Sequence, residues 1–217
     1  YFKLGLPVLI SDSLLGLGSN ILTIILGHMG AAVVASNAIC QVFERLCTVV
    51  IQGVSNASGI ITGQTIGAGN KEKAMEQGET FYFLSIVFGL FSAAAVYFFG
   101  PMTIKVYTLT PETLVVVHQL MNAYAVIAFF QAIQSVMTKG VLRGGGDTKF
   151  LMKADILFMW LLSIPLGAVG GLLFHWPAWL TMLCLRIDYV IKSIWCVSRL
   201  LSGKWIHEAN AIRKNHA

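Results

Sequence analysis

Residues 81–99 read FYFLSIVFGLFSAAAVYFF and contain no charged side chain. A helix of about 20 apolar residues is long enough to cross the hydrocarbon core of a bilayer. The run is too long for a typical strand and lacks the period-two alternation of a membrane barrel. This stretch therefore predicts a transmembrane helix and decides the fold class of the chain.

The composition of the whole chain agrees with that interpretation. Of its 217 residues, 56% are hydrophobic and only 12% are charged, about half the ~25% that is usual in soluble domains. The 13 Phe, the 5 Trp and the long aliphatic runs exclude disorder. We therefore predict an all-α integral membrane protein surrounded by a lipid bilayer.

Six apolar stretches predict six transmembrane helices. Turn-forming residues separate them, among them the glycine-rich segments 67–70 and 144–147. The predicted spans make residues 1–203 one unit and leave 204–217 as a basic tail. Because the chain begins with Tyr1 rather than Met, it is expected to be part of a longer protein. The spans are predicted at about 4–26, 31–61, 81–99, 113–136, 155–174 and 178–201.

The distribution of Lys and Arg predicts the orientation in the membrane. With Tyr1 in the cytoplasm, 11 of the 15 basic residues lie on the cytoplasmic side and only Lys105 lies outside. The other three, Arg45, Arg186 and Lys192, lie within spans. Cytoplasmic loops carry such an excess, so both ends of this segment are predicted to be cytoplasmic. The net charge of +5 is thereby attributed to topology and not to a nucleic-acid partner.

Within the second span, polar residues recur at intervals of three or four, a spacing that places them on one side of a helix. We interpret them as the lining of a water-filled or substrate path, with hydrogen bonds between helices as the alternative. In the fourth span, uncharged donors and acceptors suit a large organic substrate, and helix packing is again the alternative. The path candidates are Asn37, Gln41, Arg45, Thr48, Gln52 and Asn56 in the second span, and Gln131, Gln134 and Ser135 in the fourth.

Two carboxylates in the spans, Asp12 and Glu44, are candidates for cation coupling. A charge in the bilayer costs roughly 2.5–3.5 kcal/mol on insertion scales and usually faces a cavity or a partner. Desolvation favours a protonated carboxyl, so either residue could take up a proton or bind a sodium ion. For Glu44 the alternative is a structural ion pair with Arg45 or Arg186. The Asp188–Lys192 pair, four residues apart, is interpreted as structural.

Small residues recur every fourth position along the second span. Such a seam allows another helix to approach closely, and we predict a role in packing for Ser55, Gly59, Gly63 and Gly67.

The sequence gives little support for an enzyme. The glycines before Lys71 do not form a phosphate-binding loop, and the serines of the second span have no histidine at the same depth to act as a base. The four cysteines lie in apolar stretches, which predicts buried thiols and not metal ligands. We therefore predict no catalytic residue, no bound metal and no cofactor.

Two segments carry a resemblance to a known family. Residues 53–70 read GVSNASGIITGQTIGAGN, with KEKA following, and residues 139–149 read KGVLRGGGDTK. Both resemble the multidrug and toxic compound extrusion (MATE) family, and the resemblance covers nearly the whole chain. The second segment supplies a loop motif of that family, with Arg143, Gly144, Gly146 and Asp147 as its members.

The resemblance implies an architecture and a function. Members of the MATE family have twelve spans in two six-helix lobes. They export cationic and amphiphilic compounds from the cell in exchange for protons or sodium ions. This chain resembles the C-terminal lobe, so its implied partners are a missing N-terminal six-helix lobe and small organic substrates, in the plasma (inner) membrane. Sodium-coupled members carry acids in the first and fourth helices of this lobe. Asp12 could be the first, the fourth span has none, and Glu44 could substitute, so H⁺ and Na⁺ both remain open.

Three alternatives differ from this function. A lipid-linked precursor flippase shares the lobe architecture, and a large basic cavity would favour it. An intramembrane hydrolase would need a serine or metal site, and a membrane subunit that does not transport would need neither a path nor coupling acids. The mixture of acidic and basic residues within the spans favours the exporter.

Cysteine labelling tests the topology. In a background whose four native cysteines are replaced, Lys105→Cys is expected to react with an impermeant maleimide on intact cells. Lys149→Cys is expected to react only after permeabilisation, because the positive-inside bias places it in the cytoplasm. The reverse pattern of labelling would contradict the predicted orientation.

Overall fold

The computed structural model describes residues 2–104, 107 and 109–206, and all the regular structure within them is helical. This confirms the predicted all-α class. Three segments are π-helical, labelled η, and continue neighbouring α-helices. The elements are α1 (Phe2–His28), α2 (Ala31–Gly67), α3 (Lys71–Ile104), α4 (Pro111–Ser135), η1 (Val136–Leu142), α5 (Thr148–Asp155), η2 (Ile156–Ser163), α6 (Ile164–Ala168), η3 (Val169–Leu173), α7 (Ala178–Leu185) and α8 (Ile187–Leu201).

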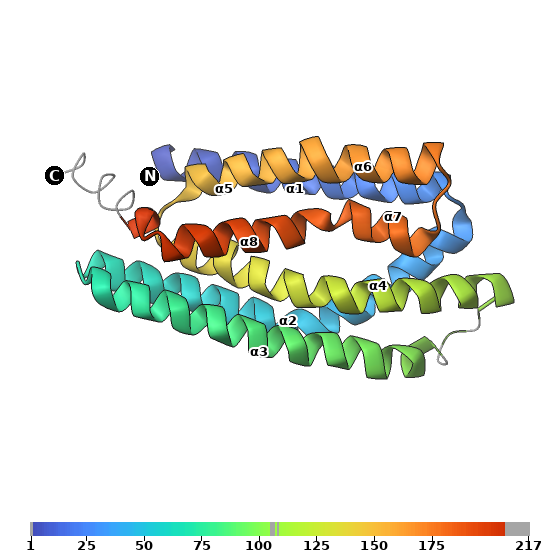
Figure 1. Ribbon diagram of the computed structural model, residues 1–217, viewed down its shortest axis with the longest axis horizontal. Coiled ribbons are helices and arrows are strands. Elements are labelled where there is room, and N and C mark those ends of the chain that lie inside the picture. Colours follow the sequence, from blue (N-terminus) through green and yellow to red (C-terminus); the bar gives the residue numbers. More distant parts are fainter. Residues whose placement is uncertain (1, 105–106, 108, 207–217) are drawn as a thin grey trace.

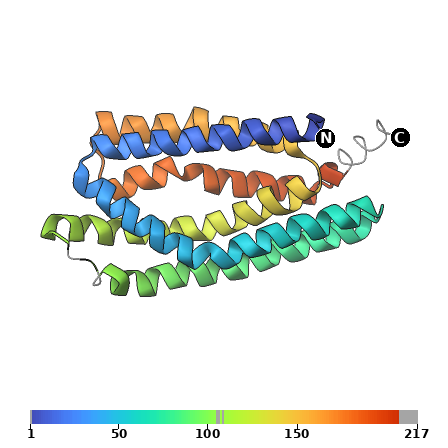
Figure 2. The same ribbon diagram turned by 180° about the vertical axis from the view of Figure 1, so that it is seen from behind.

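The helices form an elongated bundle in which the chain passes along the long axis and reverses at each turn (Figure 1). α1 pairs with the passage from α5 to η3 at one edge, and α2 packs with α3 at the opposite edge. α4 and the α7–α8 passage lie between these edges, as the reverse view also shows (Figure 2). The start of α1, the turn after α2, the loop before α5 and the end of α8 share one end of the bundle, called here the basic end.

Within the described residues, five helical passages are long and apolar enough to cross a membrane: 8–28, 31–67, 71–102, 111–142 and 148–173. The sixth predicted span lies in the α7–α8 passage, which is interrupted at Arg186, so neither half has that length. Six passages are therefore present, one of them discontinuous. The helices also extend beyond the apolar stretches, since α3 begins at Lys71 and includes the polar segment before residue 81.

Local sequence explains the helix ends. α4 starts with Pro111, and the Thr110 side chain caps it by accepting a hydrogen bond from the Thr113 backbone N–H at 3.4 Å. Proline suits this position because its missing N–H would have no partner there. Gly69 and Gly146 adopt φ values of 84° and 86° in the two turns at the basic end, a conformation that glycine accepts without a steric cost.

The outer surface of the bundle is strongly apolar. Aromatic side chains of α3 are more than two-thirds exposed, with Phe83, Phe91 and Phe98 at 68%, 73% and 72%. Groups of large apolar side chains exposed to this extent are rare on soluble monomers. The same surface is favourable against lipid tails, which agrees with a membrane-embedded bundle.

The predicted basic tail begins with a buried anchor. Trp205 is completely buried, its Nε1 donates a hydrogen bond to the Leu200 carbonyl at 3.2 Å, and its ring lies against Gly78 and Gly145. Trp205 therefore packs onto the loop before α5 and the first turns of α3. The rest of the predicted tail, from residue 207, lies outside the described residues, as does Lys105.

The small residues of α2 meet glycines at the end of the fourth passage. The Ser55 hydroxyl donates to the Ser135 carbonyl at 2.8 Å. A Cβ at Gly59 would lie 3.4 Å from the Gly140 carbonyl oxygen, whereas a Cβ at Gly67 would meet nothing within 4 Å. The closest approach to backbone is on the other side of the contact, where a Cβ at Gly144 would meet the Gly59 carbonyl oxygen and lie 2.9 Å from the Gly59 Cα.

Gly144→Ala is expected to force α2 and the end of the fourth passage apart, because both sides of the contact are backbone. Overpacking of this kind costs about 1–3 kcal/mol, so the complete protein in detergent should melt at a lower temperature than wild type. Gly53→Ala, at an exposed position of α2 where a Cβ would meet nothing within 4 Å, is the matched control and should melt close to wild type. Equal melting of the two variants would show that the contact has no role in stability.

Candidate functional site

The polar residues of α2 span a sector about 100° wide, and their exposure follows their position around the helix. Asn37 and Thr48 are buried, Gln41 and Gln52 are partly buried, and Arg45 and Asn56 are exposed. At about 100° per residue, their angles from Asn37 are about 20° (Thr48), 40° (Gln41), 60° (Gln52), 80° (Arg45) and 100° (Asn56). The predicted stripe therefore extends from the bundle interior to the open surface.

The two buried members of the stripe take part in packing. Asn37 Oδ1 accepts a hydrogen bond from the Tyr124 hydroxyl of α4 at 2.7 Å. Thr48 Oγ1 donates to the Glu44 backbone carbonyl at 2.9 Å. In this conformation the more exposed members, Gln41, Gln52 and Asn56, are better placed to meet a solute.

Glu44 is buried between α2 and α4, at 6% exposure. The polar groups that act on its carboxylate include the Gln131 side chain and the guanidinium of Arg186. Among the described residues, Glu44 Oε1, Gln131 Oε1 and Arg186 Nε have no hydrogen-bond partner. Buried polar atoms are nearly always paired in proteins, so three unpaired atoms in one region indicate a place for water, an ion or a substrate.

The interruption at Arg186 lies beside this region. The residue leaves helical geometry, with φ −114° and ψ 12°, and its Nη1 donates to the Tyr189 hydroxyl at 2.6 Å. The Asp188 backbone N–H, released by the break, donates to Ser163 Oγ at 3.0 Å. Non-helical backbone at membrane depth is tolerated where it is buried in protein or lines a water-filled cavity. No helix-breaking residue marks this position, since neither Gly nor Pro lies at it, and the break was therefore not predicted.

A second buried cluster joins three passages. Lys192 Nζ lies 2.9 Å from Asp155 Oδ1 and 3.1 Å from Asp188 Oδ2, and the Ser11 hydroxyl of α1 donates to the other oxygen of Asp155. The Asp188–Lys192 pair was predicted from its spacing. Asp155 was overlooked as a functional residue because it lay at the predicted boundary of the fifth span. The passage in fact begins at Thr148, which places Asp155 about two helical turns inside it.

The two predicted coupling carboxylates lie far apart. Asp12 is half exposed and forms an ion pair with Arg143, with 2.9 Å between Oδ1 and Nη2. Gln131, which faces Glu44, precedes Arg143 by 12 residues on the same passage, a separation of roughly 18 Å along a helix. Asp12 therefore belongs to the basic end and Glu44 to the middle of the bundle.

The loop motif of residues 143–147 connects helices from different parts of the chain. Arg143 reaches α1 through Asp12, while the buried Asp147 accepts a hydrogen bond from Arg199 Nε of α8 at 2.8 Å. Gly144 packs on α2, and Gly146 makes the turn. The motif thus ties α1, α2 and α8 together at the basic end, and no chemical role is needed to explain its composition.

The fourth-span candidates differ in their surroundings. Gln134 is buried and its Nε2 donates to Thr138 Oγ1 at 3.2 Å. Ser135 is buried too, and its hydroxyl has no partner within the described part of the chain. Of the three candidates in this span, only Gln131 faces Glu44.

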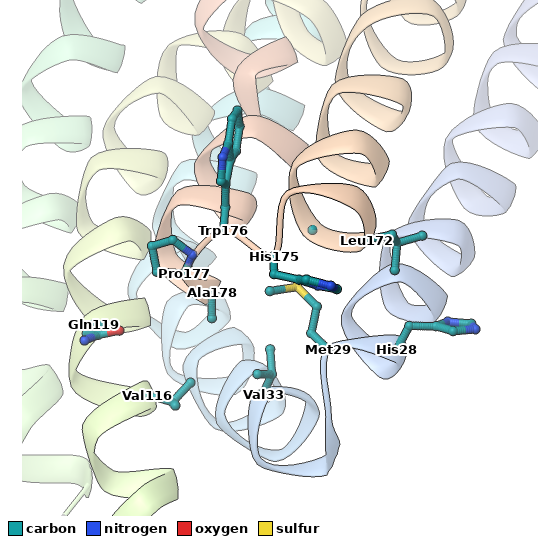
Figure 3. Close-up of a pocket in the computed structure, with 11 residues that line it drawn as sticks. His28, Met29, Val33, Val116, Gln119, Leu172, His175, Trp176, Pro177 and Ala178 are labelled. Atoms are coloured by element: carbon teal, nitrogen blue, oxygen red, sulfur yellow. The ribbon is translucent and has the colours of Figure 1, made fainter.

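A pocket of about 570 Å³ lies at the end opposite the basic end, away from both buried clusters (Figure 3). His28 and Met29 contribute from the end of α1, and His175 and Trp176 from the turn before α7. Two imidazoles alone do not make a metal site, and in the described ranges no three His, Cys, Asp or Glu side chains are grouped to hold a metal ion. The pocket includes none of the path or coupling candidates.

Comparison with known proteins identifies relatives of the whole chain. The MatE family model matches residues 7–169. A probable multidrug resistance protein NorM of Thermotoga maritima is 26% identical over 215 residues, which are 98% of this chain and 46% of that protein. The multidrug resistance protein MdtK of Yersinia pseudotuberculosis is 27% identical over 169 residues, 78% of this chain and 37% of that protein.

Solved structures show the same fold. The MATE transporter VcmN of Vibrio cholerae in its bent form superposes with a TM-score of 0.79 at 18% identity, covering 94% of this chain and 46% of that one. A MATE protein in complex with MaD5 gives a TM-score of 0.81 at 18% identity, with 89% and 44% covered. The chain thus spans about half the length of the curated relatives it matches, or less.

Ser163→Ala tests the support of the helix break. The change leaves the Asp188 N–H buried without its acceptor, which costs about 1–3 kcal/mol. The complete protein in detergent should therefore melt at a lower temperature, whereas Ser198→Ala, at an exposed position of α8, should melt like wild type. A Ser163→Ala protein as stable as that control would show that the hydroxyl does not support the break.

Proposed function

The chain belongs to the MatE family, and from this we propose that it is one lobe of a transporter that exports cationic or amphiphilic drugs and toxic organic compounds. Members of this family are transporters and not enzymes. Because the chain spans about half the length of its NorM relative, we propose that a second six-helix lobe, N-terminal to this one, completes the transport path. Export is coupled to the entry of protons or sodium ions.

The observation that carries this proposal is the unpaired polar region around Glu44. An antiporter needs a group that binds a cation on one side of the membrane and releases it on the other. A buried carboxylate with a free oxygen, next to an amide and a guanidinium that are also incompletely paired, has that capacity. Its position beside the break at Arg186 resembles the discontinuous helices that form ion and substrate sites in transporters.

The charges at the centre of the bundle do not form a basic cavity. Among the described side chains there, three carboxylates, Glu44, Asp155 and Asp188, are accompanied by three cations, Arg45, Arg186 and Lys192. A lipid-linked precursor has an anionic head group, which a basic cavity would favour and a balanced set of charges does not. The balance, together with the MatE match, therefore favours the drug exporter over the flippase.

Asp12 is proposed as a second coupling group with a different role. Its ion pair with Arg143 lies at the basic end, where the protein side chains are partly exposed. A coupling cation that binds Asp12 would compete with Arg143 and loosen the contact between α1 and the loop motif. We place this end in the cytoplasm, in accordance with the basic bias, and the protein in the plasma (inner) membrane.

Neutralising the central carboxylate tests the proposal. Glu44→Gln preserves size and hydrogen-bonding capacity but cannot carry charge, so ion-driven export should fall to near the background of empty vesicles while substrate binding remains. The complete protein is reconstituted, and efflux of a cationic dye is followed under a proton gradient and, separately, under a sodium gradient. Asp12→Asn is measured in parallel.

The control for this experiment is Glu76→Gln, which removes an exposed carboxylate of α3 and should export at the wild-type rate. Loss under one gradient alone identifies the coupling ion. Wild-type export by Glu44→Gln under both gradients would show that Glu44 does not couple, and absence of efflux in the wild type would remove the exporter function itself.

A further inference from the structure

The guanidinium of Arg186 has two candidate partners and bonds to only one of them. Its Nη1 donates to the Tyr189 hydroxyl at 2.6 Å, and its Cζ lies 5.2 Å from the centroid of the Tyr189 ring. The carboxylate of Glu44 also acts on this guanidinium. Within the described part of the chain, however, no ion pair joins Arg186 to Glu44, and Arg186 Nε and Glu44 Oε1 both lack a hydrogen-bond partner.

The other charges nearby are already engaged or lie at the surface. Asp188 acts on Arg186 too, but its carboxylate forms an ion pair with Lys192 at 3.1 Å. Arg45 acts on Glu44 together with Arg186, more weakly and from an exposed position of α2. Glu44 and Arg186 are thus an acid and a base that act on each other inside the bundle without being paired.

The break in the last passage fixes the backbone of Arg186 and leaves its side chain to choose a partner. The Arg186 N–H donates to the Met182 carbonyl at 3.1 Å, and the Arg186 carbonyl accepts from the Tyr189 N–H at 3.1 Å. Arginine has one of the largest numbers of side-chain rotamers. A change of partner at the guanidinium therefore needs no movement of the backbone.

The occupancy of Glu44 decides which partner is favourable. A cation bound to the Glu44 carboxylate compensates its charge and repels a second positive group beside it. Once that cation has left, the buried carboxylate lacks a close counter-charge, which is strongly destabilising. The guanidinium of Arg186 is then the nearest described group that can supply one from the bundle interior.

We propose that Arg186 is a tethered counter-ion, which competes with the transported or coupling cation for Glu44 and is held by the Tyr189 hydroxyl while that cation is bound. The described conformation has the guanidinium at Tyr189. Return of the guanidinium to Glu44 displaces the cation, so the carboxylate always has a positive partner. This inference rests on the proposed function of Glu44 as a cation site and adds how the cation is released.

Binding measured at equilibrium, with no gradient, tests the competition. The complete protein in detergent is dialysed against tetraphenylphosphonium and, separately, against radioactive sodium. Tyr189→Phe keeps the ring and every charge but removes the acceptor of a charge-assisted hydrogen bond. The guanidinium should then stay at Glu44, and the affinity for the cation should fall about tenfold. Tyr97→Phe, at an exposed position of α3, is the control and should bind like wild type.

Two arginine variants separate a tethered counter-ion from a general effect of charge. Arg186→Gln removes the competitor, so the cation should bind more tightly than in wild type. Arg45→Gln removes the same charge from an exposed position and should give a smaller gain. Equal gains in these two variants, or wild-type affinity in Tyr189→Phe, would overturn the proposal. If Arg186→Gln does not fold, Tyr189→Phe decides alone, because it alters no charge.

Glu44→Gln in the same assay distinguishes this inference from the proposed function. Binding that is lost in Glu44→Gln but unchanged in Tyr189→Phe would keep Glu44 as a cation site and refute only the competition by Arg186. A wild type that binds neither tetraphenylphosphonium nor sodium would remove the cation site itself, and the tethered counter-ion with it.

Discussion

A chain in hydrocarbon must satisfy its backbone hydrogen bonds internally, because lipid offers no partner to an exposed N–H or C=O. Every described passage except one meets this constraint with continuous helix. At Arg186 the helix is interrupted, and the freed groups are supported by side chains, notably Ser163. The break is thus supported by the packing of η2, which ends at Ser163, against α8, and it places Arg186 near Glu44. The unpaired polar atoms around Glu44 and the one described break within a passage therefore lie beside each other.

The ionisable groups obey a second constraint, since each buried charge needs a compensating one. The structure meets it by pairing residues that are distant in sequence. Asp12 and Arg143 are 131 residues apart, and Asp147 and Arg199 are 52 apart. These pairs hold α1 and α8 to the loop before α5. Toward the centre, the acids Glu44, Asp155 and Asp188 are accompanied by Arg45, Arg186 and Lys192, and Glu44 Oε1 and Arg186 Nε remain without a hydrogen-bond partner among the described residues.

Much of the fold could be predicted from sequence because its strongest signal is local. A charge-free run such as 81–99 admits one structure in a membrane, and glycine turns separate the runs. The discontinuity could not be predicted, because residues 178–201 have no Gly or Pro at position 186. The candidate site could be predicted from the sequence only in part. Glu44 was identified from its cost in the bilayer, but the pairing of Asp155 with Lys192 depends on how two passages pack, which no spacing within one helix reveals. The partner of the α2 seam, Gly144, was noticed only as a member of a loop motif.

The angular order of the polar residues on α2 has a consequence for how a solute could travel. They form two diagonal rows, Asn37–Gln41–Arg45 and Thr48–Gln52–Asn56, each starting inside the bundle and ending at its surface. The rows repeat at an interval of 11 residues, roughly 16 Å along the axis. In the transport path proposed above, α2 would therefore present two separate groups of polar side chains at different depths, in place of one continuous row.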